Sequence, residues 1–245
     1  MSFAVSPQPG HASRGNLRIQ VTQSQDQWAA AAAEHLACVL RAKPEACIGW
    51  PTGSTPLPLY AALRRRAAAG TFDASGSRAA MLDEYVNAPE EFSSYRWLRR
   101  QVWAPLGIAT VLRITEDGEE FERVLRTWGG CALQLLGLGA NGHIAFNEPG
   151  AAVDSRTRAV KLTAETAAAN AAYWGGRFTP AEAVTMGMAT ILEASAILLL
   201  VRGAAKAGVL RRMLQEPIGP QLPATFLREH KNVTIVADQE AAAEL

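Results

Sequence analysis

A histidine and two side chains that could orient it lie within one eight-residue stretch of the chain. They are Asn141, His143 and Glu148. A histidine titrates near neutral pH, and a neighbouring carboxylate or amide can hold its ring in one orientation. Because an isolated histidine is more often structural than catalytic, the grouping matters more than His143 alone. The stretch is therefore a candidate acid–base site.

Two acids, Asp83 and Glu84, directly follow the short apolar run at residues 79–82. Adjacent acids in a loop are usually only solvated. Asp83 becomes a candidate site residue because its loop is predicted to face the same pocket as Asn141, His143 and Glu148.

The segment PTGSTP at residues 51–56 carries the features of an anion-binding turn. Gly53 permits tight backbone geometry, and Thr52, Ser54 and Thr55 supply hydroxyl groups. Pro56 suits the first turn of a following helix, whose positive end attracts anions. An ordinary helix cap would look similar, so the pattern alone is compatible with both interpretations.

Lys206 is a second candidate anion ligand, because it follows the clearest apolar run through Arg202 and Gly203. The plain interpretation is a surface charge near the start of a helix. The helix dipole disfavours a cation there, and an anion beside it would remove that cost.

The segment GLGANG at residues 137–142 fits the dinucleotide pattern G-x-G-x-x-G. Pro149 and Gly150 end any helix soon after it, and the acid about 20 residues on, Glu165, falls within a predicted helix. Both features speak against a nicotinamide enzyme.

Short apolar runs alternate with helical patterns, which predicts an α/β fold with a mostly parallel central sheet flanked by helices. We expect strands at residues 17–21, 46–50, 79–82, 132–136, 194–201 and 232–237. We expect helices at 26–41, 57–69, 119–128 and 164–173, a short strand and a helix within 181–192, and a further helix ending near residue 214.

Four polar loops, at 51–56, 83–87, 139–148 and 202–206, each follow a predicted strand. Ligands of open parallel sheets bind outside the carboxyl ends of the strands. The four loops should therefore form one polar pocket.

Composition narrows the class of protein. We expect a flexible arm over residues 1–15 and a single domain over 16–245. The longest apolar run, at 194–201, falls far short of the roughly 18 residues that a membrane span needs. With 24 basic and 23 acidic side chains the formal charge is +1, which gives no general attraction for nucleic acid.

Three cysteines, Cys38, Cys47 and Cys131, have neither metal-type spacing nor an even framework of bridges. They predict reduced, buried thiols and a cytoplasmic protein.

The motifs PTGSTP, LDEYV, GLGANGHIAFNEPG, SRTR and RGAAK occur in the order and spacing of glucosamine-6-phosphate deaminases. The chain resembles that family over residues 17–238. The related 6-phosphogluconolactonases share a similar threonine–glycine loop but differ at DEYV and GHIAFNEP. The resemblance implies a Rossmann-like layered fold and conversion of glucosamine 6-phosphate to fructose 6-phosphate and ammonia. It implies neither a metal nor an organic cofactor.

The resemblance also implies roles for single residues. Asp83 would move a proton from C2 to C1 of the open-chain sugar, and His143 would handle the proton of the ring oxygen. Glu148 and Asn141 would orient and tune the imidazole. Thr52, Gly53, Ser54 and Lys206 would hold the phosphate, and Thr55 completes the candidate phosphate turn.

Two positions depart from the family pattern. Asn141 stands where many members carry aspartate; an amide can fix the histidine ring by hydrogen bonding but cannot offset its positive charge. Ala172 matches a position where members carry a phosphate-binding arginine. Either Arg177 reaches the phosphate instead, or the substrate lacks the phosphate.

Polar residues of the family's second, allosteric phosphate site are depleted, with Ala151, Ala152 and Val160 around SRTR. This favours a monomer or small homo-oligomer over a regulated hexamer.

Three alternatives remain: a deaminase or isomerase of a different amino sugar, galactosamine-type or unphosphorylated; a 6-phosphogluconolactonase; and a non-catalytic sugar-sensing domain. A sensor attached to DNA would need a helix-turn-helix, for which the 16 residues before the first strand are too few. It would also have no chemical need for Asp83, His143 and Glu148 together.

Overall fold

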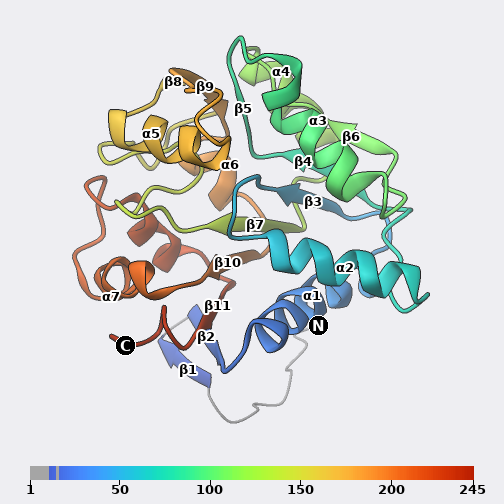
Figure 1. Cartoon of the computed structure of the whole chain (residues 1–245), viewed down its shortest axis with the longest axis horizontal. Helices are drawn as coiled ribbons and strands as arrows, with labels where there is room; N and C mark the ends of the chain where they lie inside the picture. Colours follow the sequence, from blue (N-terminus) through green and yellow to red (C-terminus); the bar gives the residue numbers. More distant parts are fainter. Residues whose placement is uncertain (1–10, 15–16) are drawn as a thin grey trace.

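A computed structural model of the chain describes residues 11–14 and 17–245. Its main feature is a sheet in the order β1-β2-β11-β10-β7-β3-β4-β6 (Figure 1). The strands of this sheet are β1 (His11–Arg14), β2 (Leu17–Thr22), β3 (Cys47–Trp50), β4 (Arg78–Met81), β6 (Thr110–Leu112), β7 (Leu133–Gly137), β10 (Ile197–Val201) and β11 (Val233–Asp238). All neighbouring pairs are parallel except β1 and β2.

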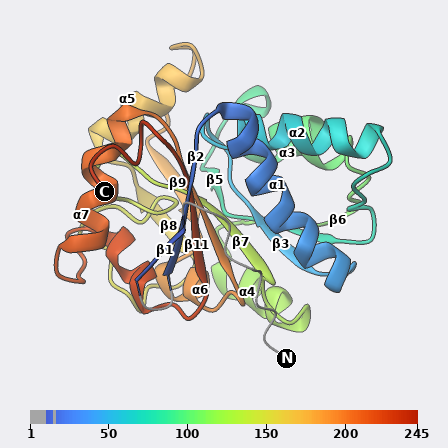
Figure 2. The ribbon, with the colours of Figure 1, turned by 90° about the horizontal axis from the view of Figure 1, so that it is seen from below.

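Helices cover both faces of the sheet. Figure 2 shows α1 and α2 on one side of it and α7 on the other. The helices are α1 (Gln25–Ala42), α2 (Leu57–Ala68), α3 (Ser94–Leu98), α4 (Gly118–Thr127), α5 (Ala164–Tyr173), α6 (Met188–Leu192) and α7 (Ala207–Gln215). Strand β10 is buried along its whole length, as expected of a parallel strand covered on both faces. The predicted α/β fold with a mostly parallel sheet is confirmed.

A second, three-stranded sheet was not predicted. Its order is β5 (Asp83–Tyr85), β9 (Glu182–Thr185) and β8 (Arg158–Lys161), and both pairs are antiparallel. The expectation of a loop over residues 83–87 is therefore wrong for its first three residues. Backbone pairing with β9, which the local sequence does not reveal, extends them.

The expectation of a flexible arm was wrong at the edge of the main sheet. Residues 11–14, which we expected to belong to a flexible arm, form β1 and pair with β2. The open edge of β2 offers backbone groups that any extended segment can pair with. The rest of the expected arm, residues 1–10 and 15, lies outside the described residues.

The cysteines follow the prediction only in part. All three are free; Cys47 and Cys131 are buried with their sulfur atoms 4.0 Å apart, whereas Cys38 is exposed on α1. Over the described part of the chain, no helix is both long and apolar enough to cross a membrane.

Strands β3 and β7 are neighbours in the sheet, and the chain adds its later strands in opposite directions on either side of this pair. The chain runs outward from β3 to β4 and β6, then returns to β7 and continues to β10 and β11. Loops that leave β3 and β7 therefore diverge and open a crevice at their carboxyl ends, where ligands of such sheets bind.

Candidate active site

A cavity of about 260 Å³ lies at this crevice, and all four predicted loops line it. Its walls include Asp83, His143 and Lys206. Further predicted site residues in its lining are Thr52, Gly53, Ser54, Thr55 and Asn141. Glu148 is the one predicted site residue outside the lining, and it lies behind His143. Residues far apart in the chain thus share one pocket.

Asp83 is a buried carboxyl group at the start of β5, with 7% of its surface exposed. Burial raises its pKa to about 7, the nearby charge of Glu84 adds to the rise, and a hydrogen bond with Thr52 opposes it. A carboxyl group with a pKa near 7 can both accept and return a proton at neutral pH.

The imidazole of His143 lies against a carboxylate. Its Nδ1 is 3.5 Å from Oε2 of Glu148, close enough for an ion pair although the ring nitrogen lacks hydrogen-bond geometry. Burial opposes ionisation of Glu148, but the neighbouring side chains of His143, Thr166 and Asn141 outweigh it and lower its pKa to about 2. Glu148 therefore remains negative beside the ring.

Asn141 acts differently from our expectation that it fixes the ring. Its Nδ2 donates to Glu148 Oε2 at 2.8 Å, and its Oδ1 accepts from the backbone N–H of His143 at 3.1 Å. The amide thus holds the carboxylate and the histidine backbone, and it is the carboxylate rather than the amide that lies against the imidazole.

The loop that carries His143 has little conformational freedom. Ala145 adopts a positive φ of 53°, which costs energy for a residue with a side chain. The buried Asn147 donates to the carbonyls of Ile144 and Met186 at 3.0 and 2.8 Å. A methyl group on Gly139 would lie 2.4 Å from the His143 ring. Position 139 therefore has to be glycine for the ring to occupy its place.

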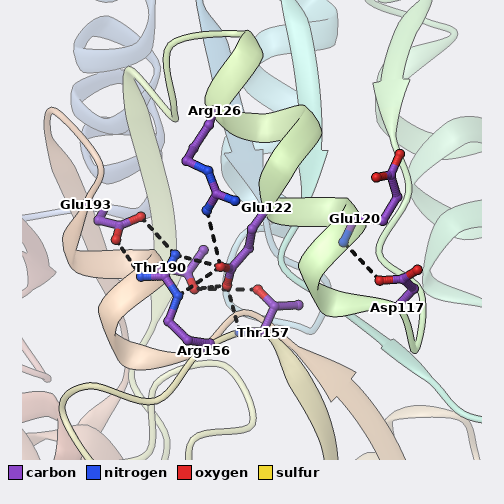
Figure 3. A network of polar contacts seen from close by, with 8 residues as sticks. All are labelled: Asp117, Glu120, Glu122, Arg126, Arg156, Thr157, Thr190 and Glu193. Atoms are coloured by element: carbon purple, nitrogen blue, oxygen red, sulfur yellow. Dashed lines mark hydrogen bonds and ion pairs between the residues drawn. The ribbon is translucent and has the colours of Figure 1, made fainter.

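A polar network anchors Arg156 and Thr157, further along the chain, to α4 and α6 (Figure 3). Glu122 of α4 is buried and accepts from the backbone N–H of Thr157 at 2.8 Å, from the Thr190 hydroxyl and from the Arg156 guanidinium. The following residue, Arg158, donates to Asn147 at 3.0 Å. The network thus supports the His143 loop from behind.

The predicted phosphate turn has the expected backbone. Gly53 has a φ of +95°, which residues with a side chain rarely adopt. The Thr52 hydroxyl lies 3.5 Å from that of Ser94. Lys206 is the residue before α7, and burial lowers the pKa of its ammonium group. It is the only lysine or arginine among the described residues that line this cavity.

Helix α5 forms a wall that sequence reasoning missed. Glu165, Thr166, Asn170 and Tyr173 line the cavity from it. Their spacing is the only sequence signal, since positions three or four apart share one helix face. Tyr85 of β5 donates to Asn170 at 2.6 Å and so ties this wall to the strand that carries Asp83.

The missing arginine is not replaced from nearby. Ala172 is exposed and does not line the cavity. The guanidinium group of Arg177 lies over the Phe92 ring at 5.2 Å and 3.9 Å from Glu91, outside this cavity. The suggestion that Arg177 reaches the phosphate is therefore wrong for this structure.

The backbone after GLGANG also argues against a dinucleotide-binding site. After GLGANG the chain forms turns and the isolated Ile144–Asn147 bridge, and the next helix is α5. The prediction that no helix begins at this motif is confirmed.

The chain is similar to known proteins over most of its length. Residues 20–236 match the family model of glucosamine-6-phosphate isomerases/6-phosphogluconolactonase. A glucosamine-6-phosphate deaminase of Streptomyces avermitilis is 42% identical over 226 residues, 87% of each chain. One of Rhodopirellula baltica is 40% identical over 243 residues, 94% of this chain and 96% of its own.

Solved structures give the same result. A monomeric glucosamine-6-phosphate deaminase superposes with a TM-score of 0.88 and 31% identity, over 93% of this chain and 99% of its own. A 6-phosphogluconolactonase from Plasmodium vivax, with a TM-score of 0.74 and 15% identity over 93% of this chain and 92% of its own, shares the fold. The chain belongs to the glucosamine-6-phosphate isomerase/6-phosphogluconolactonase family.

Proposed function

We propose that this protein is a glucosamine-6-phosphate deaminase, which converts glucosamine 6-phosphate to fructose 6-phosphate and ammonia. The observation that carries the proposal is the meeting of Asp83 and His143 in one cavity. Relatives named for this activity, about 40% identical over most of the chain, support it.

The first step is ring opening. His143 transfers the proton between O1 and O5 of the sugar, and the aldehyde at C1 is released. Glu148 stabilises the imidazolium that forms, because its lowered pKa keeps it ionised. Asn141 holds Glu148 in place through the 2.8 Å hydrogen bond.

The second step is proton transfer from C2 to C1. The Asp83 carboxylate removes the proton at C2, which the C1 aldehyde makes acidic, and an enolamine forms. The protonated Asp83 then returns the proton to C1, and a ketimine results at C2. Addition of water to the ketimine releases ammonia and leaves the ketose. A pKa of about 7 suits a group that acts as base and then as acid.

Substrate binding is assigned to the phosphate turn and Lys206. Thr52, Gly53, Ser54 and Thr55 would donate backbone and hydroxyl hydrogens to the phosphate, and Lys206 would supply a positive charge. Since Ala172 provides no guanidinium, we expect a higher KM for the phosphorylated sugar than in relatives with an arginine there.

An ammonia-release assay tests the proposal. Glucosamine 6-phosphate, galactosamine 6-phosphate and unphosphorylated glucosamine are supplied separately, with 6-phosphogluconolactone as the control for lactonase activity. We expect turnover of glucosamine 6-phosphate and a loss of at least roughly 100-fold in Asp83→Asn, the scale of a lost general base. Faster turnover of an unphosphorylated or galactosamine-type sugar would support that substrate instead. Lactone hydrolysis without ammonia release would refute the proposal.

We further infer a cytoplasmic enzyme, consistent with three free thiols, that works as a monomer or small homo-oligomer on a small sugar phosphate. A solved relative described as monomeric supports this state. Sedimentation analysis of the purified protein measures it, and a mass of six chains would contradict it.

A further inference from the structure

A second cavity, of about 1220 Å³, lies outside the proposed active site and is rich in arginine. Five guanidinium groups line it, those of Arg96, Arg99, Arg100, Arg113 and Arg177. The protein as a whole has a formal charge of only +1. The concentration of positive charge here is therefore local. We call it the arginine cavity.

Three of the arginines share one helix face. Arg96 lies in α3, and Arg99 and Arg100 lie in the π-helical turn Arg99–Trp103 that continues it. Residues three and four positions apart are neighbours on a helix surface, where like charges repel. The opposite side of this helix is apolar, with Leu98, Val102 and Trp103 buried. An anion bound beside the arginines would remove the repulsion.

Acidic neighbours neutralise only some of this charge. Arg96 pairs with Glu90, and Arg177 lies 3.9 Å from Glu91. Within the described part of the chain, neither Arg99, Arg100 nor Arg113 forms an ion pair. Three positive charges at the cavity thus have no acidic partner.

Arg113 is held in place without losing its hydrogen-bond donors. Its guanidinium carbon lies 4.1 Å from the centre of the Tyr95 ring. Stacking on a ring occupies one face of the planar group and leaves its N–H edge free for oxygen atoms. Arg113 reaches the cavity from the segment after β6, and Arg99 and Arg100 reach it from the helix. The arginines that line the cavity therefore come from separate elements.

The arginine cavity is distinct from the proposed active site. The linings of the two cavities have no residue in common, and they adjoin at strand β5. Asp83 lines the active-site cavity and Glu84 lines the arginine cavity. The Glu84 carboxylate is already occupied, since it accepts from the backbone N–H groups of Ser94 and Tyr95 at 2.8 and 3.0 Å.

We propose that the arginine cavity binds a small phosphorylated anion with at least two negative charges. Arginine is the side chain best suited to paired phosphate oxygens, which its planar fork contacts two at a time. A cavity of about 1220 Å³ accommodates a molecule larger than a single phosphate. The occupant is therefore a diphosphate or a phosphorylated metabolite.

Calorimetric titration with pyrophosphate tests the proposal on the full-length protein at low ionic strength. The Lys206→Ala variant serves as the background, because it weakens binding at the proposed active site. In this background we expect a binding event that the double substitution Arg99→Ala/Arg100→Ala weakens at least tenfold. The matched control removes two exposed arginines elsewhere, Arg65→Ala/Arg211→Ala, and should bind pyrophosphate unchanged.

Circular dichroism and thermal unfolding establish that the double variant is folded. Equal pyrophosphate affinity in the double variant and the control would overturn the proposal, as would absence of the event in the background protein. Tight binding of a single-stranded oligonucleotide without any binding of pyrophosphate would also overturn it, because the arginines would then form a nucleic-acid surface.

Discussion

Asp83 and Glu148 are two carboxyl groups that the same site holds in different protonation states. Burial raises the pKa of Asp83 to about 7. Neighbouring side chains overcome the effect of burial on Glu148 and lower its pKa to about 2. Groups whose environments separate their pKa values in this way are suited to different tasks. The first can exchange a proton at neutral pH, and the second provides a constant negative charge.

The raised pKa of Asp83 predicts the pH dependence of turnover. The base must be ionised, so kcat/KM should fall about tenfold per pH unit below pH about 7. Glu84→Gln removes a charge that contributes to the rise and should move this limb to lower pH. A pH profile of kcat/KM for both proteins measures the effect. An unmoved limb would contradict the contribution of Glu84.

The same shift affects stability with a definite sign. An acid whose pKa is raised on folding holds its proton more tightly in the native state. Its contribution to the free energy of unfolding is complete below the pKa of the unfolded chain. It is lost as the pH rises through about 7. Asp83→Asn should remove this part of the pH dependence.

A comparison of Glu148 with Asn141 tests the division of roles around His143. Glu148→Gln removes the charge next to the imidazole, and we expect kcat to fall by roughly 10- to 100-fold, short of a complete loss of acid–base catalysis. Asn141→Ala leaves the carboxylate in place and should cost less. Steady-state kinetics of both variants decide the order, and the reverse order would show that the amide matters more than the charge.

At the scale of elements, α4 supports the His143 loop through a single buried carboxylate. Glu122 accepts from the Thr157 backbone, Thr190 and Arg156 (Figure 3). Arg158 then donates to Asn147, which lies in the His143 loop. Substitutions that disrupt α4 should therefore lower both the free energy of unfolding and the activity.

Glu122→Ala tests this support. The substitution leaves a buried backbone N–H and a hydroxyl unpaired, and we expect the free energy of unfolding to fall by roughly 2–3 kcal/mol. Glu120→Ala is the matched control on the same helix, because its exposed side chain pairs with Arg123 alone among the described residues. It should cost much less than Glu122→Ala, since exposed ion pairs contribute little to stability. Urea unfolding of both variants measures the difference, and equal losses would contradict the role of Glu122.

Elements with a strong local signal could be predicted from the sequence, and elements stabilised by distant partners could not. The buried run of β10 and the alanine-rich α1 follow from apolar content and helical periodicity. Strand β8 alternates between exposed and half-buried residues and has no apolar run. It exists because β9, more than 20 residues later, pairs with it. Strands β5 and β6 likewise depend on pairing with strands that are distant in the sequence, β9 and β4 respectively.

The candidate site could likewise be predicted from the sequence only in part. Four loops were expected to converge because each follows a strand of a parallel sheet, and all four line the cavity. The α5 wall was missed, since which face of a surface helix turns toward a pocket depends on tertiary packing. The contacts of Asn141 were also missed, because residue type alone does not show whether an amide meets the ring or the carboxylate.

For the whole molecule, the position of β11 between β2 and β10 is central. All six residues of β11 pair with β2, and its first five pair with β10. Deletion of residues 233–245 should therefore abolish cooperative unfolding in urea, monitored by circular dichroism. Deletion of residues 239–245 retains the strand and serves as the control. A sigmoidal transition in the longer deletion would show that the sheet forms without β11.

This arrangement also constrains how the protein forms during translation. The ribosome makes β11 more than 200 residues after its partner β2, so this edge of β2 stays unpaired in the nascent chain until β11 has emerged. Pairing over such a sequence separation is slow, and the exposed edge invites association between chains. We expect the newly made polypeptide to depend on rapid release or on a chaperone more than the stability of the finished enzyme suggests.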